Sequence, residues 1–180
     1  MEAVAVNNRP RPLVGTDEVS VDDKGRVLLS KKHQERMGKN FAVLISAVGC
    51  ICLYPEDEWF ELYDKISSAS VGNLWREQYS RLVLGDVEDD QNLDSNGRYL
   101  IPARQRSLGH VEQKGRVVIK GMGKWLEIWD AKEYEFFTRD PESYNRQRRE
   151  MFERAYSKAF PTAQAPILLN FGGEGGGNAG

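Results

Sequence analysis

An internal repeat constrains this chain more than any other feature of its sequence. Residues 21–38 read VDDKGRVLLSKKHQERMG and residues 93–109 read LDSNGRYLIPARQRSLG, so an Asp, a Gly and an Arg recur in the same order 72 positions apart. A second match joins residues 53–62 to residues 128–137 at a separation of 75 positions. Each unit spans roughly 45 residues, a length typical of tandem structural repeats. The 180-residue chain therefore contains two copies of one small unit.

The local chemistry of one unit predicts strands joined by a tight turn and followed by helices. Residues 22–25 and 94–97 are typical of such turns, because Asp bonds the backbone ahead of it and Gly adopts the left-handed conformation. A short helix and two apolar β segments follow in each unit. A closing helix then begins at Pro55 and at Asp130, with acidic side chains near its positive end. Between the units, Asn73 is expected to cap a helix that Gly85 ends.

These elements predict an α+β protein, mainly β, made of two units with flanking helices. The expected organisation is an N-terminal extension (1–16), a first unit (17–64), a linker helix region (65–87), a second unit (88–131), a C-terminal helical region (132–160) and a Gly-rich tail (161–180). The tail has the composition of a disordered segment. Its apolar stretch, residues 167–171, is expected either to be inert or to dock on a neighbour.

The charge of the chain is nearly balanced, with 25 Lys and Arg against 27 Asp and Glu, and this total argues against a nucleic-acid partner. The distribution along the chain reverses the argument. Residues 22–39 and residues 94–116 each carry three more basic than acidic side chains, whereas acids gather in residues 56–64 and 86–90. The two turns thus lie in basic patches, which suit phosphate contacts, although many basic runs are only solvated faces.

We predict Asp22, Lys24, Arg26, Asp94 and Arg98 as the DNA-binding residues. A turn requires Asp and Gly, but nothing in a turn requires Arg after the Gly. A guanidinium at such a position can form two hydrogen bonds with a phosphate or with a guanine, and the preceding Asp can orient it. The alternative is an Asp–Arg salt bridge that only holds the turn.

Neither catalysis nor a metal site is expected. The chain has none of the nucleotide-binding, nucleophile-elbow or metalloprotease motifs. We expect His33 and His110 to be surface or capping residues, and Cys50 and Cys52 to be small apolar residues on one face of a strand. The sequence therefore predicts a protein that is not an enzyme and has no cofactor.

The expected location is the cytoplasm. The longest apolar run, residues 41–54, is shorter than a membrane span, and the N-terminus does not resemble a secretion signal. We therefore expect no membrane partner.

The motifs resemble the MraZ family of bacterial transcriptional regulators, whose members carry two SpoVT-AbrB-type domains in one chain. The resemblance covers about residues 17–135 and rests on strings in the right order, namely DDKGR with DSNGR, GRYLIPARQR at 97–106, LYP at 53–55 followed by Trp59, and LEIWD at 126–130. Within it, Asp22 with Arg26 and Asp94 with Arg98 match the family's Asp-x-x-x-Arg motif, which is implicated in DNA contact. Ser30 stands where the family usually has Pro, whereas Pro102 keeps that pattern.

The resemblance implies two AbrB-like, swapped-hairpin units that form a β-barrel about a pseudo-two-fold axis. It also implies a homo-oligomeric ring and a nucleoid-associated repressor that binds direct repeats in double-stranded DNA upstream of the division and cell-wall gene cluster. Two alternatives stay open from the residues themselves. One is a self-assembling, protein-binding scaffold without DNA affinity, and the other is an enzyme that uses the carboxylates of residues 56–64.

Overall fold

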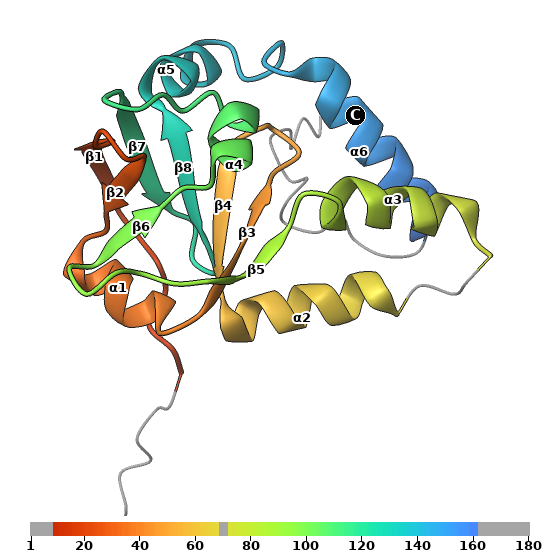
Figure 1. Cartoon of the computed structure of the whole chain (residues 1–180). Coiled ribbons are helices and arrows are strands. Elements are labelled where there is room, and N and C mark those ends of the chain that lie inside the picture. Colours follow the sequence, from red (N-terminus) through yellow and green to blue (C-terminus); the bar gives the residue numbers. More distant parts are fainter. Residues whose placement is uncertain (1–8, 69–71, 162–180) are drawn as a thin grey trace, which may run out of the picture.

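The computed structural model describes residues 9–68 and 72–161, which form an α+β fold (Figure 1). Most of the predicted tail, with its apolar stretch 167–171, and residues 1–8 of the N-terminal extension lie outside the described residues. The strands are β1 (Thr16–Ser20), β2 (Arg26–Leu28), β3 (Phe41–Ile45), β4 (Ile51–Pro55), β5 (Glu88–Gln91), β6 (Arg98–Leu100), β7 (Arg116–Gly121) and β8 (Leu126–Asp130). The helices are α1 (Lys31–Met37), α2 (Glu56–Ser67), α3 (Leu74–Leu84), α4 (Ala103–Leu108), α5 (Ala131–Arg139) and α6 (Arg146–Ala159).

Six strands form one antiparallel sheet in the order β1-β7-β8-β4-β3-β5. In the repeat, β5, β7 and β8 are the counterparts of β1, β3 and β4. The pairings β1 with β7 and β5 with β3 therefore each join one unit to the other. At the centre, β4 pairs with β8. Each unit therefore contributes its first strand to the other unit. If every strand is replaced by its counterpart, the strand order reads the same from either end.

The sheet is open, and the described residues contain no closed barrel. Strands β1 and β5 are its two edges, and β2 and β6 form a separate two-stranded sheet, which we call the ribbon. The tight turns after β1 and β5 redirect the chain, so that β2 and β6 pair with each other instead of extending the main sheet. The barrel expected from the family resemblance is thus not found in this form.

Both faces of the sheet are buried at β3 and β4, where successive residues point to opposite faces and each face is covered. In β3, Phe41, Val43 and Ile45 face the core beneath the ribbon and α1, whereas Ala42 and Leu44 face the core beneath α2 and α5. This explains why β3 and β4 are apolar throughout rather than alternating. Helices α3 and α6 pack against each other in a third cluster.

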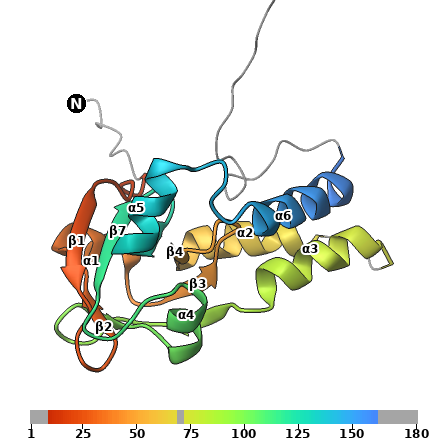
Figure 2. The same ribbon diagram turned by 90° about the horizontal axis from the view of Figure 1, so that it is seen from above.

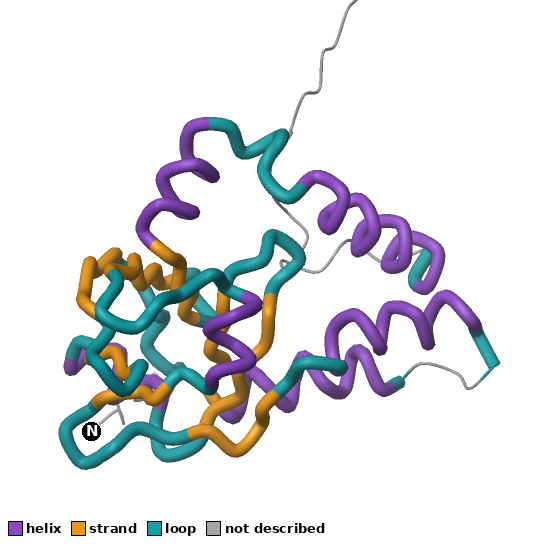
Figure 3. The backbone as a smooth tube through the Cα atoms, turned by 45° about the horizontal axis from the view of Figure 1, so that its top comes forward, coloured by secondary structure: helices purple, strands orange, loops and turns teal. Residues whose placement is uncertain are grey.

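The ribbon lies at the opposite end of the molecule from the paired helices α3 and α6 (Figures 1 and 2). Figure 3 shows the same arrangement, with α3 and α6 running side by side beyond the strands. No helix in the described part of the chain has both the length and the apolar character needed to cross a membrane.

The expectation that His33 lies at the surface or caps a helix is wrong. Its side chain is 1% exposed, and its ring nitrogens lie 3.1 Å from the carbonyl of Val14 and 3.5 Å from the carboxylate of Asp17. Helix α1 packs this side chain against the segment that leads into β1, which the spacing of apolar residues does not reveal. His110, by contrast, is exposed.

Glu127 is a buried carboxyl group in the core beneath α2 and α5, where it accepts hydrogen bonds from the indole N–H groups of Trp129 (2.8 Å) and Trp125 (3.4 Å). Burial raises the pKa of Glu127, and the two indoles offset only part of that rise. The folded protein therefore binds the carboxyl proton of Glu127 more tightly than the unfolded chain does. The stability that protonated Glu127 contributes is complete below the ordinary pKa of 4.5 and is lost as the pH rises through the raised pKa.

We therefore expect Glu127→Gln, which stays neutral, to gain stability relative to the original protein as the pH rises from about 4 to about 7. Urea denaturation of both proteins across this range measures the difference in free energy of unfolding. A difference in the free energy of unfolding that does not change with pH would contradict a raised pKa of Glu127.

Candidate nucleic-acid interface

The first turn, residues 22–25, is closed by its own backbone and by one carboxylate. The amide of Gly25 donates to the carbonyl of Asp22 (3.1 Å), and the amide of Asp22 donates to the carbonyl of Arg26 (2.9 Å). Asp22 Oδ1 accepts the amides of Lys24 (2.9 Å) and Arg26 (2.8 Å), while Oδ2 accepts Arg26 Nε at 2.7 Å. One carboxylate therefore holds both the turn and the guanidinium that follows it.

The second turn, residues 94–97, repeats this backbone arrangement. Asp94 Oδ1 accepts the amides of Asn96 and Arg98, both at 2.9 Å, and Gly97 donates to the carbonyl of Asp94 at 3.0 Å. The guanidinium of Arg98 forms no salt bridge within the described residues. Instead, Asp94 Oδ2 lies 3.8 Å from Arg26 Nη1, so that Arg26 lies between the carboxylates of both turns.

The two turn carboxylates are held in the ionised form. The backbone N–H of Arg26 makes the largest contribution to lowering the pKa of Asp22, and the backbone N–H of Arg98 does the same for Asp94. Both groups therefore remain acceptors at neutral pH. This orients the Arg26 guanidinium, which pairs most strongly with an ionised carboxylate.

The ribbon places the predicted arginines on one exposed face. Arg26 lies opposite Leu100, Val27 opposite Tyr99, and Leu28 opposite Arg98. The central pair points inward, and Val27 and Tyr99 are each 1% exposed. We use the name ribbon face for the outward side chains, namely Arg26, Leu28, Arg98 and Leu100. The structure thus brings the two predicted arginines together on one surface, with Lys24, Asp22 and Asp94 in the turns beside it.

Each turn is covered by a side chain from the other unit. Arg106, which donates to the carbonyl of Ile101 (2.7 Å), lies against Gly25 of the first turn. Gln34, which occupies the equivalent position in the first unit, lies against Gly97 of the second turn. Neither role was predicted from the sequence, although Gln34 and Arg106 are 72 positions apart, as the repeat requires.

Gly25 allows a direct test of this cover. It has a φ of +85°, and a Cβ there would clash with the guanidinium of Arg106, whereas Gly123 has a φ of +86° and open space. Alanine at either position costs roughly 1–2 kcal/mol through backbone strain alone. We expect Gly25→Ala to lower the free energy of unfolding by more than Gly123→Ala does, since Arg106 must also leave the turn. Equal losses in urea denaturation would count against the contact.

Several basic residues of the predicted patches form ion pairs with acidic side chains of the same chain, although they remain exposed. Arg116 pairs with Glu18 at 2.7 Å, and Arg104 Nε donates to Asp86 at 3.0 Å. Among the described residues, no salt bridge is formed by Lys24, Lys31, Lys32, Lys39, Arg98 or Lys114. The basic patches are thus smaller than the residue count implied, and they centre on the turns and on α1.

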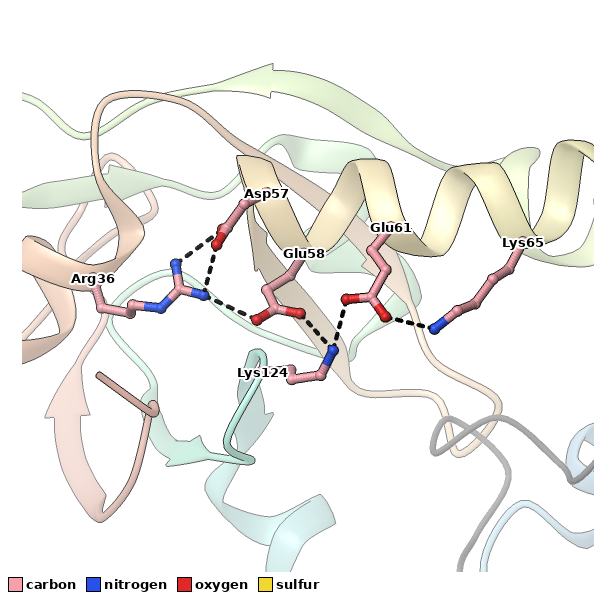
Figure 4. A network of polar contacts seen from close by, with 6 residues as sticks. All are labelled: Arg36, Asp57, Glu58, Glu61, Lys65 and Lys124. Carbon is pink, nitrogen blue, oxygen red and sulfur yellow. Dashed lines mark hydrogen bonds and ion pairs between the residues drawn. The ribbon is translucent and has the colours of Figure 1, made fainter. Parts of the chain in front are cut away.

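The acidic cluster of residues 56–64 takes part in a network of ion pairs on α2 (Figure 4). Hydrogen bonds from Lys124 and then Lys65 lower the pKa of Glu61 to about 2. This network accounts for Asp57, Glu58 and Glu61 as partners of cations, which gives no support to a catalytic role for these three acids. Its members are Arg36, Asp57, Glu58, Glu61, Lys65 and Lys124.

Within residues 9–68 and 72–161, one group of side chains could hold a metal ion, namely Cys50, Cys52 and Glu127, whose ligand atoms lie within 4.8 Å of one another. Both cysteines are buried, as predicted, and their sulfur atoms are 3.9 Å apart. Burial raises the pKa of each thiol, which disfavours the thiolate form that binds metals. We therefore assign this group to the core.

The exchanged strands and the paired Asp–Arg turns define a class of tandem-repeat α+β protein in which two copies of one hairpin unit share a sheet. The family model described as "MraZ protein, putative antitoxin-like" matches residues 13–81 and again residues 87–155. The chain therefore belongs to the MraZ family. Each match extends beyond the predicted unit into the helices that follow it.

Three relatives named "Transcriptional regulator MraZ" illustrate the similarity. The chain is 35% identical over 130 residues to the protein of Chromobacterium violaceum, covering 70% of this chain and 86% of the relative. It is 30% identical over 133 residues to that of Bifidobacterium longum, covering 74% and 87%. It is 27% identical over 121 residues to that of Finegoldia magna, covering 67% and 82%.

Proposed function

We propose that this chain is a sequence-specific DNA-binding transcriptional regulator that acts as a repressor. The observation that carries the proposal is the ribbon face, on which both repeat arginines project beside two turns that hold their carboxylates ionised. Relatives named as transcriptional regulators add support. Arg26 and Arg98 would contact bases or phosphates, Lys24 would contact phosphate, and Asp22 and Asp94 would orient the arginines.

The proposal includes the symmetry and assembly expected for such a regulator. The palindromic strand order supports a pseudo-two-fold relation between a first unit at 17–64 and a second at 88–131. Several copies in a ring would bind direct repeats upstream of the division and cell-wall gene cluster. Linked modules bind repeated sites far more tightly than one module does, because the second contact is intramolecular. The site of action would be the nucleoid in the cytoplasm.

A salt titration tests DNA binding and sequence specificity together. The probes are the DNA upstream of the protein's own gene and a scrambled duplex of the same composition. Each contact of Lys24, Arg26 or Arg98 with a phosphate should add about −0.9 to the slope of log affinity against log salt. The slope for each bound chain should therefore lie between about −1, with Lys24 alone on a phosphate, and about −3, with all three on phosphates. The upstream DNA should bind more tightly than the scrambled DNA at every salt concentration. Equal affinity for the two probes would overturn the proposal.

A second candidate function is a protein-binding scaffold, favoured by an exposed apolar groove between α3 and α6. Leu74, Trp75 and Met151 line it, and all three side chains are partly or largely exposed. Self-assembly without any affinity for the upstream DNA, even at low salt, would favour this function over the first.

A further inference from the structure

Two leucines on the ribbon face are exposed to solvent, and neither the turns nor the core requires a leucine at these positions. Leu28 is 51% exposed and Leu100 is 53% exposed, although each directly follows a fully buried residue. They occupy the same position in the two units, 72 residues apart. A single exposed leucine needs no explanation. Two leucines at equivalent positions, each directly across the ribbon from a predicted DNA-binding arginine, define a patterned surface.

The ribbon face has the shape and pattern of a reader of the DNA major groove. A two-stranded antiparallel ribbon fits this groove, and the outward side chains then meet the edges of the bases. The arginines lie on one diagonal of the face and the leucines on the other, because Arg26 is opposite Leu100 and Leu28 is opposite Arg98. Arg26 is also held in place by Asp22 at 2.7 Å. Arginine recognises guanine in this groove, whereas a leucine needs an apolar group.

The thymine 5-methyl group is the apolar group that the major groove offers. Opposite side chains in an antiparallel pair have Cβ atoms about 4.5–5.5 Å apart, about 1–2 Å more than the ~3.4 Å rise between successive bases, and the length of the Arg side chain can span that difference. Each Arg–Leu pair can therefore reach neighbouring base pairs. We infer that Leu28 and Leu100 contact thymine methyl groups next to the guanines that Arg98 and Arg26 recognise. This inference rests on the proposed function and adds the residues that set its sequence preference.

Uracil in place of thymine tests the contact, because it removes the methyl group and leaves base pairing unchanged. The probe is the upstream DNA with its thymines replaced by uracil, one at a time. For the original protein, each contacted methyl group should contribute about fourfold in affinity. Leu28→Ala should bind thymine DNA about fourfold more weakly and lose discrimination between thymine and uracil at one position. Leu100→Ala should do the same at the position contacted by the second unit.

Leu108→Ala is the matched control, because Leu108 is 38% exposed on α4 and lies outside the ribbon face. It should retain the full preference for thymine, and all three variants should keep the original melting temperature. If the original protein prefers the upstream DNA but uracil has no effect at any position, the inference fails and the proposed function stands. If the original protein shows no preference for the upstream DNA, the proposed function itself fails. Loss of self-assembly in Leu28→Ala and Leu100→Ala, with thymine discrimination retained, would instead assign the leucines to a protein contact and overturn the inference.

Discussion

Replacing Arg26 and Arg98 together by alanine is expected to abolish the preference for the upstream DNA while leaving the fold intact. A guanidinium that forms two hydrogen bonds with a base contributes about 1–3 kcal/mol, so the loss of both should cost about 2–6 kcal/mol. That corresponds to a loss of roughly thirtyfold or more in affinity. The fold should tolerate the change, because the Asp22–Arg26 salt bridge is partly exposed and such pairs contribute about 1 kcal/mol or less.

Fluorescence anisotropy at fixed salt measures the affinity, and thermal melting measures the fold. Arg139→Ala is the control for the loss of an arginine elsewhere: it removes one positive charge, half of the charge removed by the double variant, from an exposed salt bridge with Glu135 on α5, outside the ribbon face. Arg26→Lys, used in place of Arg26→Ala, should not restore the lost affinity for DNA, because an ammonium group cannot form the paired hydrogen bonds of a guanidinium. The expectation would be contradicted if the double variant bound as tightly as the Arg139→Ala control.

The largest expected effect on stability is that of Tyr99→Ala. Tyr99 fills the inward side of the ribbon opposite Val27, and its ring meets that of Phe41 edge to face, with centroids 5.2 Å apart. Removing a large buried aromatic side chain costs about 3–5 kcal/mol, because the surrounding side chains close the cavity only in part. We expect a loss of this size in urea denaturation, and weaker DNA binding, since the ribbon would no longer be fixed to the sheet.

Leu100→Ala provides the control for Tyr99→Ala within the same strand. Leu100 is the next residue but points outward, so its loss should change the free energy of unfolding by no more than about 0.5 kcal/mol. Similar losses for the two variants would contradict the inward and outward assignment of the ribbon.

Local structure could be predicted from the sequence wherever a side chain forms hydrogen bonds with backbone groups close to it in the chain. The caps at Asn73 and Asp130 are confirmed, because each carboxamide or carboxylate oxygen accepts two amides from the first turn of its helix. Gly85 ends α3 as predicted. The pairing of strands could not be predicted in this way. Strand β1 pairs with β7 more than ninety residues away, and local patterns identify strands without identifying their partners.

The turns beside the ribbon face were predictable, and its apolar half was not. The Asp-x-x-Gly-Arg strings located both turns, and the structure places the Asp22–Arg26 salt bridge in the first of them. Leu28 and Leu100 each lie within a run of three apolar residues, VLL and YLI, in which no alternation marks the exposed member. Their exposure becomes apparent only when the pairing of β2 with β6 turns Val27 and Tyr99 inward.

Because the two units exchange strands, some strands must wait for their partners while the chain is synthesised on the ribosome. Thr16 at one end of β1 pairs with Lys120 in β7, so the earliest strand to emerge has no partner until the second unit is almost complete. At ordinary rates of translation this is a wait of roughly 5–20 s. The apolar hairpin of β3 and β4 emerges during that interval without its neighbours β5 and β8. The nascent chain is therefore most exposed to aggregation while its second half is still being made.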